Sequence, residues 1–178
     1  GQEPGIITKL GALLENSDEG IRYHAVRAIA NLAWHTVNQV NIGQELGIIT
    51  KLGTLLKNSD EGIRYHAVRA IANLAILKAN QERIGQEPGI ITKLGTLMVN
   101  ANAEMRRAAL DAIANLAMLP VNQESIGQEP GIITKLGTLM VNANAEMRRA
   151  ALAAIAKLAL NENNQASIGQ EPGIITKL

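Results

Sequence analysis

Residues 85–126, GQEPGIITKLGTLMVNANAEMRRAALDAIANLAMLPVNQESI, decide the fold of this chain. Their opening residues, Gly-Gln-Glu, recur every 42 residues, beginning at Gly1, Gly43, Gly85, Gly127 and Gly169. The 178 residues therefore divide into units 1–42, 43–84, 85–126 and 127–168 and a C-terminal stub, 169–178. A fixed period of this length is typical of helical arrays, in which each unit buries its apolar face only against its neighbours. We expect a single continuous array.

Each unit is predicted to contain three helices. Ile21, Ala25 and Leu32 belong to an apolar stripe with helical spacing, which predicts a long helix over 19–34 with Asp18 as its N-cap. A second stripe predicts a shorter helix that ends near Asn16. Segments such as 80–87 allow one or two further helical turns before a bend at a Pro-Gly pair.

Across essentially the whole chain these residues resemble armadillo repeats. In the first unit the counterparts of the family pattern are Gly5, Ile7, Leu10, Leu13, Leu14, Asp18, Ile21, Ala25, Ala28, Ile29, Asn31, Leu32 and Ala33. The resemblance implies an all-α fold, a right-handed α-solenoid of armadillo-type three-helix units.

The chain departs from the family pattern at two repeated positions. Threonine stands where the family usually has proline, at Thr8, Thr50, Thr92 and Thr134. Glycine replaces an apolar residue inside a helix at Gly11, Gly53, Gly95 and Gly137. A glycine there costs roughly 0.5 to 1 kcal/mol relative to alanine. We favour close packing of a neighbouring helix against these glycines over an underfilled site copied four times.

The copies fall into two pairs of nearly identical units. Units one and two share NSDEGIRYH, and units three and four share VNANAEMRR. Most differences within a pair lie at the end of the third helix and in the next loop. Such block-wise identity favours deliberate assembly from repeated segments, with a recently amplified gene as the alternative. The start without Met and the end within a predicted helix favour the same interpretation.

Composition limits the possible functions. The absence of Cys excludes disulfides and thiolate metal sites, and the net charge of +1 gives no field that would favour nucleic acid or an anionic membrane. No apolar run approaches the length of a membrane span, so we expect a cytoplasmic-type or recombinant protein. His24 and His66 occupy one repeated position with no partner at a catalytic spacing, and we interpret both as surface residues. We predict no enzyme activity, no cofactor and no metal.

The resemblance implies a groove lined by third helices, in which an Asn near the helix end binds the backbone of an extended peptide. The matching residues are Asn31, Asn73 and Asn115, and Lys157 takes this place in the fourth unit. The alternative is that these Asn side chains only decorate or terminate their helices.

Residues four and eight positions earlier lie on nearly the same helical face. They are Arg27, Arg69, Asp111 and Ala153, preceded by Tyr23, Tyr65, Arg107 and Arg149. We therefore expect a locally basic groove that suits an acidic extended peptide, or else a merely solvated charged face. Trp34 is the only indole, and we expect it to cover the first unit rather than to anchor a ligand.

Two function classes follow. The first is a non-catalytic repeat scaffold without an evolved ligand, and the alternative is a module that binds an extended protein segment. The incomplete end units also predict stacking head to tail, or exchange of end segments, between copies of the chain.

Overall fold

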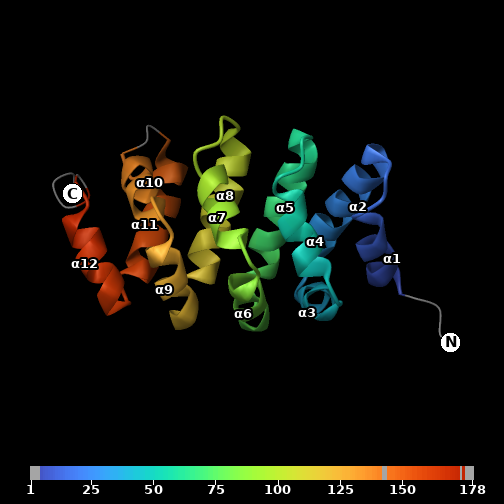
Figure 1. Cartoon of the computed structure of the whole chain (residues 1–178), viewed down its shortest axis with the longest axis horizontal. Helices are drawn as coiled ribbons and strands as arrows, with labels where there is room; N and C mark the ends of the chain where they lie inside the picture. Colours follow the sequence, from blue (N-terminus) through green and yellow to red (C-terminus); the bar gives the residue numbers. More distant parts are fainter. Residues whose placement is uncertain (1–4, 142–143, 173, 175–178) are drawn as a thin grey trace.

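The computed structural model describes residues 5–141, 144–172 and 174, and this part of the chain is all helical. Its twelve helices follow one another in a repeating order (Figure 1). The short second helices of the units are α1 (Ile6–Leu13), α4 (Ile48–Leu55), α7 (Ile90–Leu97) and α10 (Ile132–Leu139). The long third helices are α2 (Glu19–Leu32), α5 (Glu61–Leu74), α8 (Ala103–Leu116) and α11 (Ala145–Leu158). The linking helices are α3 (Thr36–Gln44), α6 (Lys78–Gln86), α9 (Pro120–Gln128) and α12 (Glu162–Gln170).

Equivalent helices stack in rows along an elongated molecule. The third helices form one row, because α5 packs between α2 and α8, and α8 packs against α11. In Figure 1 the linking helices α3, α6 and α9 lie along the lower edge, and α1 and α12 lie at opposite ends of the array. The fold is thus an armadillo-type α-solenoid, as the sequence predicts.

The third helices begin at polar caps that recur with the repeat. Asp18 and Asp60 accept hydrogen bonds from the backbone N–H groups of Ile21 and Ile63, and Asn102 does the same for two N–H groups of α8. Such caps satisfy backbone donors that the first turn of a helix leaves unpaired. The bend before each later second helix occurs at a glycine with positive φ, at Gly47, Gly89 and Gly131. The chain bends at Gly47 although no proline precedes it. The bend therefore requires the glycine and not the Pro-Gly pair.

Helix lengths differ from the predictions in three places. The long helix ends at Leu32 rather than at Trp34, because Ala33 closes it with a backbone bond to Ile29 and the next residues form a turn. The second helix of the first unit, α1, ends at Leu13 rather than near Asn16. The linking helix predicted as one or two turns is a nine-residue helix, Lys78–Gln86.

A buried asparagine joins each of the linking helices α6, α9 and α12 to the one before it. Asn122 Nδ2 donates to the carbonyl of Gln81 in α6, at 2.9 Å, and to that of Leu116 in α8, at 3.2 Å. Its amide lies where a Cβ on Gly85 would stand, 2.0 Å from that position. Asn80 and Asn164 make the same pair of bonds and face Gly43 and Gly127. A side chain at these positions would overlap the asparagine amide, so glycine is needed there for the next repeat to pack.

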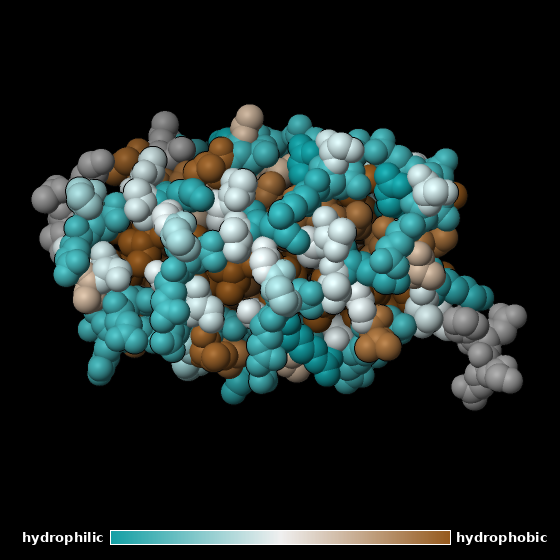
Figure 2. Space-filling view, viewed as in Figure 1, coloured by the Kyte–Doolittle hydropathy of each residue, from teal (hydrophilic) through white to brown (hydrophobic). Residues whose placement is uncertain are grey.

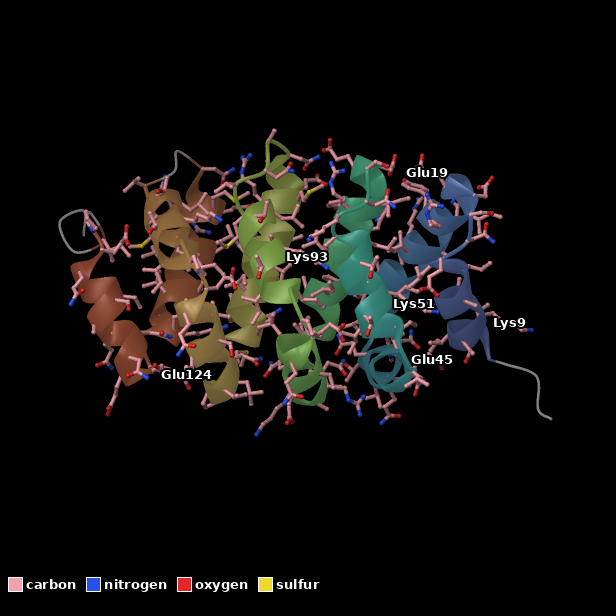
Figure 3. All side chains as sticks on the ribbon, viewed as in Figure 1. Lys9, Glu19, Glu45, Lys51, Lys93 and Glu124 are labelled. Atoms are coloured by element: carbon pink, nitrogen blue, oxygen red, sulfur yellow. The ribbon has the colours of Figure 1, made fainter. Side chains whose placement is uncertain are left out.

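The glycines inside the second helices are also contact points, which confirms the predicted close packing. Cβ positions built at Gly11, Gly53 and Gly95 lie 2.9 to 3.1 Å from an isoleucine of the following repeat. Lys51 and Lys93 hold matching places on α4 and α7 (Figure 3), and each ammonium donates to the carbonyl of the preceding glycine, Gly11 or Gly53. Successive second helices are thus joined by an apolar contact and by a lysine.

The surface in view in Figure 2 is mainly hydrophilic, with apolar atoms visible between the polar rows. Within the described residues, no helix combines the length and the hydropathy that crossing a membrane requires. Half of the predicted stub, residues 173 and 175–178, lies outside the described residues, as do residues 1–4.

Candidate functional site

The third helices line a groove of about 650 Å³. Six of the predicted peptide-binding residues contribute to it: Tyr65, Arg69, Asn73, Arg107, Asn115 and Lys157. The other four, Tyr23, Arg27, Asn31 and Arg149, are not among its lining residues. Alanines of α5, α8 and α11 form much of the floor between these side chains. The structure thus brings together candidates from units two to four, and places those of unit one beyond the end of the groove.

The predicted asparagine ladder joins repeats. Asn73 Nδ2 donates to the carbonyl of Ala30 in α2, and Asn115 Nδ2 donates to that of Ala72 in α5, each at 3.1 Å. Asn73 is only 7% exposed. Lys157 continues the series, since its ammonium donates to the carbonyl of Ala114 in α8 at 3.0 Å. Lys157 therefore makes the same contact between repeats as the asparagines. From the sequence alone it seemed to interrupt their series.

The third helices make a second contact with each other, and its residues differ between the first half of the array (units one and two) and the second half (units three and four). In the first half the ring of Tyr23 lies against Gly62, whose added Cβ would approach it to 2.8 Å. In the second half the corresponding residues are Arg107 and Glu146, and their charged groups are 3.4 Å apart. This explains why each pair of units shares its own block of sequence around these positions.

At the junction between the two halves, a residue of α5 from the first half contacts a residue of α8 from the second half. Tyr65 belongs to the first block and Glu104 to the second, and the two side chains form a hydrogen bond. Burial, followed by this bond and the charge of Glu104, raises the pKa of the Tyr65 hydroxyl, while Arg69 opposes the shift. The phenol is therefore held in its neutral form as a donor to the carboxylate.

Charges of both signs line the groove, whereas the sequence predicts a locally basic one. Its lining holds the cations Arg69, Arg107 and Lys157, and an equal number of carboxylates, Glu104, Asp111 and Glu146. Arg107 is bound within the protein, because its Nε lies 3.0 Å from both oxygens of Asp111. An arginine held by two carboxylates is a weak attractor for an acidic ligand.

His66 is buried between the first two third helices, which corrects its interpretation as a surface residue. It is 7% exposed, and its ring lies 5.3 Å from that of Tyr23 and 5.1 Å from that of Tyr65. Desolvation, then the charges of Arg69 and Arg27, lowers the pKa of its imidazole, against a smaller opposing effect of Asp60. Its Nδ1 has no hydrogen-bond partner among the described residues. His24, at the matching position of α2, is exposed as predicted.

Trp34 does not cover the first unit. Its side chain is 74% exposed, and together with Ile76 it lines the groove beside Arg69 and Asn73. The same repeat position holds Met118 and Leu160, which are also exposed. Of these apolar side chains only Trp34 and Ile76 line the groove, and exposed apolar side chains at a groove are a feature of interaction surfaces.

Two sets of residues that join neighbouring elements within a unit were not predicted from the sequence. A glutamine in each linking helix donates to the carbonyl at the C-cap of the preceding third helix, as Gln81 does to Ala75 at 2.9 Å. An arginine near the start of each of the first three third helices donates to two loop carbonyls, as Arg64 does to Asn58 and Ser59. Their regular recurrence was the available signal. Among the described residues, no three His, Asp or Glu side chains gather as metal ligands would.

Comparisons with known proteins agree with this architecture. A family model described as proteasome non-ATPase 26S subunit matches residues 2–170. No curated protein matches the chain. A crystal structure of an engineered protein shares the fold, with a TM-score of 0.88 at 24% identity, over 98% of this chain and 72% of the other.

Two designed proteins are similar to the chain in fold and sequence. One is a computationally designed armadillo repeat protein for modular peptide recognition, with a TM-score of 0.87 and 26% identity over 95% of this chain and 71% of the other. The second is a designed armadillo repeat protein in complex with the peptide (KR)4, with a TM-score of 0.86 and 26% identity over 96% and 71% of the two chains. By these matches the chain belongs to the proteasome non-ATPase 26S subunit family and is an armadillo-type repeat scaffold.

Proposed function

We propose that this scaffold is non-catalytic and that its third-helix groove binds an extended peptide segment. The observation that supports this most directly is the groove itself, in which half-buried polar side chains of α5, α8 and α11 alternate with small alanines. Small residues leave room for a peptide backbone, and polar side chains at regular intervals can pair with it. A similar designed protein binds the peptide (KR)4, which supports the same use of this surface.

The asparagine rungs are not the best test of this proposal. Because Asn73 and Asn115 bond to the preceding third helix, their replacement would disturb the array as well as any ligand. Arg69 lines the groove without an ion-pair partner among the described residues, so Arg69→Ala changes the surface with less effect on the fold.

The test is an anisotropy titration of labelled extended peptides, one acidic, one neutral and one basic, at low and physiological salt. Saturable binding that weakens in Arg69→Ala supports the proposal. Lys78→Ala, an exposed change on the linking helix α6, is the matched control and should leave affinity unchanged. No saturation by any peptide at about 1 mM, which corresponds to roughly 4 kcal/mol of binding free energy, would leave a scaffold without a ligand.

The near-identity of the unit pairs, together with the designed relatives, supports deliberate assembly of the array from repeated segments. End-to-end association of copies is a further part of the proposal. Light scattering over a wide dilution series tests it, and a constant monomer mass at the highest concentration would contradict it.

A further inference from the structure

In every unit a large apolar side chain lies exposed directly after the C-cap of the third helix. Two further exposed valines lie in the first turn of the linking helices α3 and α9. These side chains form a row, which we call the apolar edge, of Trp34, Val37, Ile76, Met118, Val121 and Leu160. Trp34 and Ile76 line one groove, and Met118 and Leu160 line a second hollow, so apolar groups of adjacent repeats are neighbours.

The apolar edge lies in the stretch where the copies of the repeat differ most. Two positions after the C-cap residue's neighbour the four units share no character, with Thr36, Lys78, Pro120 and Glu162. The position directly after the C-cap, in contrast, is large and apolar in all four units. Single exposed apolar residues are common on proteins, but a continuous apolar row is typical of a contact surface.

The area of the apolar edge fits a second copy of the chain. Its six side chains are between 53% and 74% exposed. If a large apolar side chain offers about 150 to 200 Å² when fully exposed, the six together present roughly 600 Å². Two such edges in contact would bury about 1,200 Å², which is the lower end of the range for stable protein interfaces. A second copy brings an equal apolar surface to the contact, as an interface with twofold symmetry requires.

The charges beside the apolar edge favour one orientation of the second copy. Lys78 and Glu162 occupy the same position of their units, in the first turns of α6 and α12, and both are exposed. In a parallel pair each unit would meet itself, so each of these charges would face its own copy. In an antiparallel pair unit one meets unit four and unit two meets unit three, so Lys78 and Glu162 each face an uncharged residue. Like charges placed opposite one another are unfavourable, which favours the antiparallel pair.

Two further carboxylates do not change this choice. Glu82 and Glu124 lie one turn further along the linking helices α6 and α9, and each would meet a carboxylate in either orientation.

We propose that two copies of this chain form an antiparallel dimer through their apolar edges, with Trp34 of each copy against Leu160 of the other and Ile76 against Met118. The twofold axis crosses the edge between α5 and α8. This inference is independent of the proposed peptide binding. It also differs from end-to-end association, because a twofold contact closes at two copies whereas a head-to-tail contact can continue.

Light scattering and Trp emission over one dilution series test the dimer. The mass should rise from that of one chain to that of two and then stop. Trp34 is the only Trp and is exposed in the single chain, so its emission should move to shorter wavelength with the same concentration midpoint. A mass that stays at one chain up to about 1 mM, a concentration that corresponds to weak binding, would overturn the inference.

Substitutions in the apolar edge separate this dimer from other association. Met118→Ser with Leu160→Ser should weaken the dimer about tenfold or more, because each copy loses two large apolar contacts. The same change should abolish the shift of Trp34 emission, although three repeats separate Leu160 from Trp34 within one chain. Val99→Ser, an exposed change in the turn between α7 and α8, is the matched control and should leave the dimer unchanged. Association that the double variant leaves intact would overturn the inference.

Cross-linking tests the orientation, because the chain has no Cys and introduced thiols are therefore unique. Trp34→Cys and Leu160→Cys variants are treated with a short bismaleimide cross-linker, separately and as a mixture. We expect linked pairs in the mixture and few in either variant alone. Linking of each variant to itself, as efficient as linking in the mixture, would show a parallel or unspecific contact and would overturn the antiparallel dimer.

Discussion

Asn122 binds two backbone carbonyls that belong to successive repeats, and it does so with one buried nitrogen. The carbonyls are those of Gln81 and Leu116, and the side chain is 2% exposed. Asn122→Ala removes the donor and leaves both carbonyls without this partner, so we expect a loss of about 2 to 3 kcal/mol in the free energy of unfolding. Urea denaturation monitored by circular dichroism measures this loss.

Asn38 is the matched control, because it holds the same position in α3, and no described linking helix precedes α3. Asn38→Ala should cost less than about 1 kcal/mol, since a bond between repeats is not lost there. Similar losses at Asn38 and Asn122 would mean that the contact with the preceding repeat contributes little.

His66 predicts a pH dependence of stability. Its pKa is lowered from 6.5 in the folded chain, so the unfolded chain binds the proton more readily. The stabilisation is therefore complete above about pH 6.5 and is lost as the pH falls through the unfolded pKa towards the lowered folded one. We expect the free energy of unfolding to decrease between pH 7 and pH 5, and His66→Gln to remove most of that decrease. His24→Gln, an exposed change at the matching position, should leave the slope intact.

At the scale of elements, the contact between α2 and α5 predicts a reciprocal pair of substitutions. Gly62→Glu copies the residue found in the second half, but its Cβ would meet the Tyr23 ring at 2.8 Å, so we expect destabilisation by about 1 to 2 kcal/mol. Adding Tyr23→Arg copies the Arg107 and Glu146 pair and should recover most of that loss.

A double-mutant cycle measures the coupling between these two positions. Because an exposed ion pair contributes only about 0 to 1 kcal/mol, relief of the clash should supply most of the coupling. If the two changes had additive effects on the free energy of unfolding, the Tyr23 ring would move aside without cost. The residues at these two positions would then not need to occur in matched pairs.

The helices were more predictable from the sequence than the contacts between them. The period, the third helix and the packed glycines such as Gly53 follow from spacing within one unit. The roles of Asn115 and Lys157 did not follow, because a donor near a helix end has the same local pattern whether it faces a ligand or the preceding helix. The full pairing of Arg107 did not follow either, since Asp111 lies within its own helix but Glu146 lies across a repeat boundary.

At the scale of the whole molecule, stability should vary along the array. In a repeat protein the free energy of folding is close to a sum of unit terms and neighbour-interface terms. The first short helix, α1, is less covered than α4, since Ile6 is 66% exposed and Ile48 only 1%. Leu13 and Leu55 differ in the same direction, at 37% and 5%. Identical sequences in different positions therefore bury different amounts of apolar surface.

Leu13→Ala and Leu55→Ala form a matched pair, because both change the same residue of the repeat. The buried Leu55 should cost about 3 kcal/mol or more, and the half-exposed Leu13 about 1 kcal/mol, since less apolar surface and a smaller cavity are involved. Native-state hydrogen exchange should show the same gradient, with the amides of α1 exchanging before those of α5 and α8. Uniform protection from α1 to α8 would contradict a sum of local terms. It would mean that the interfaces between units are strong enough, relative to the units themselves, for the array to open only as a whole.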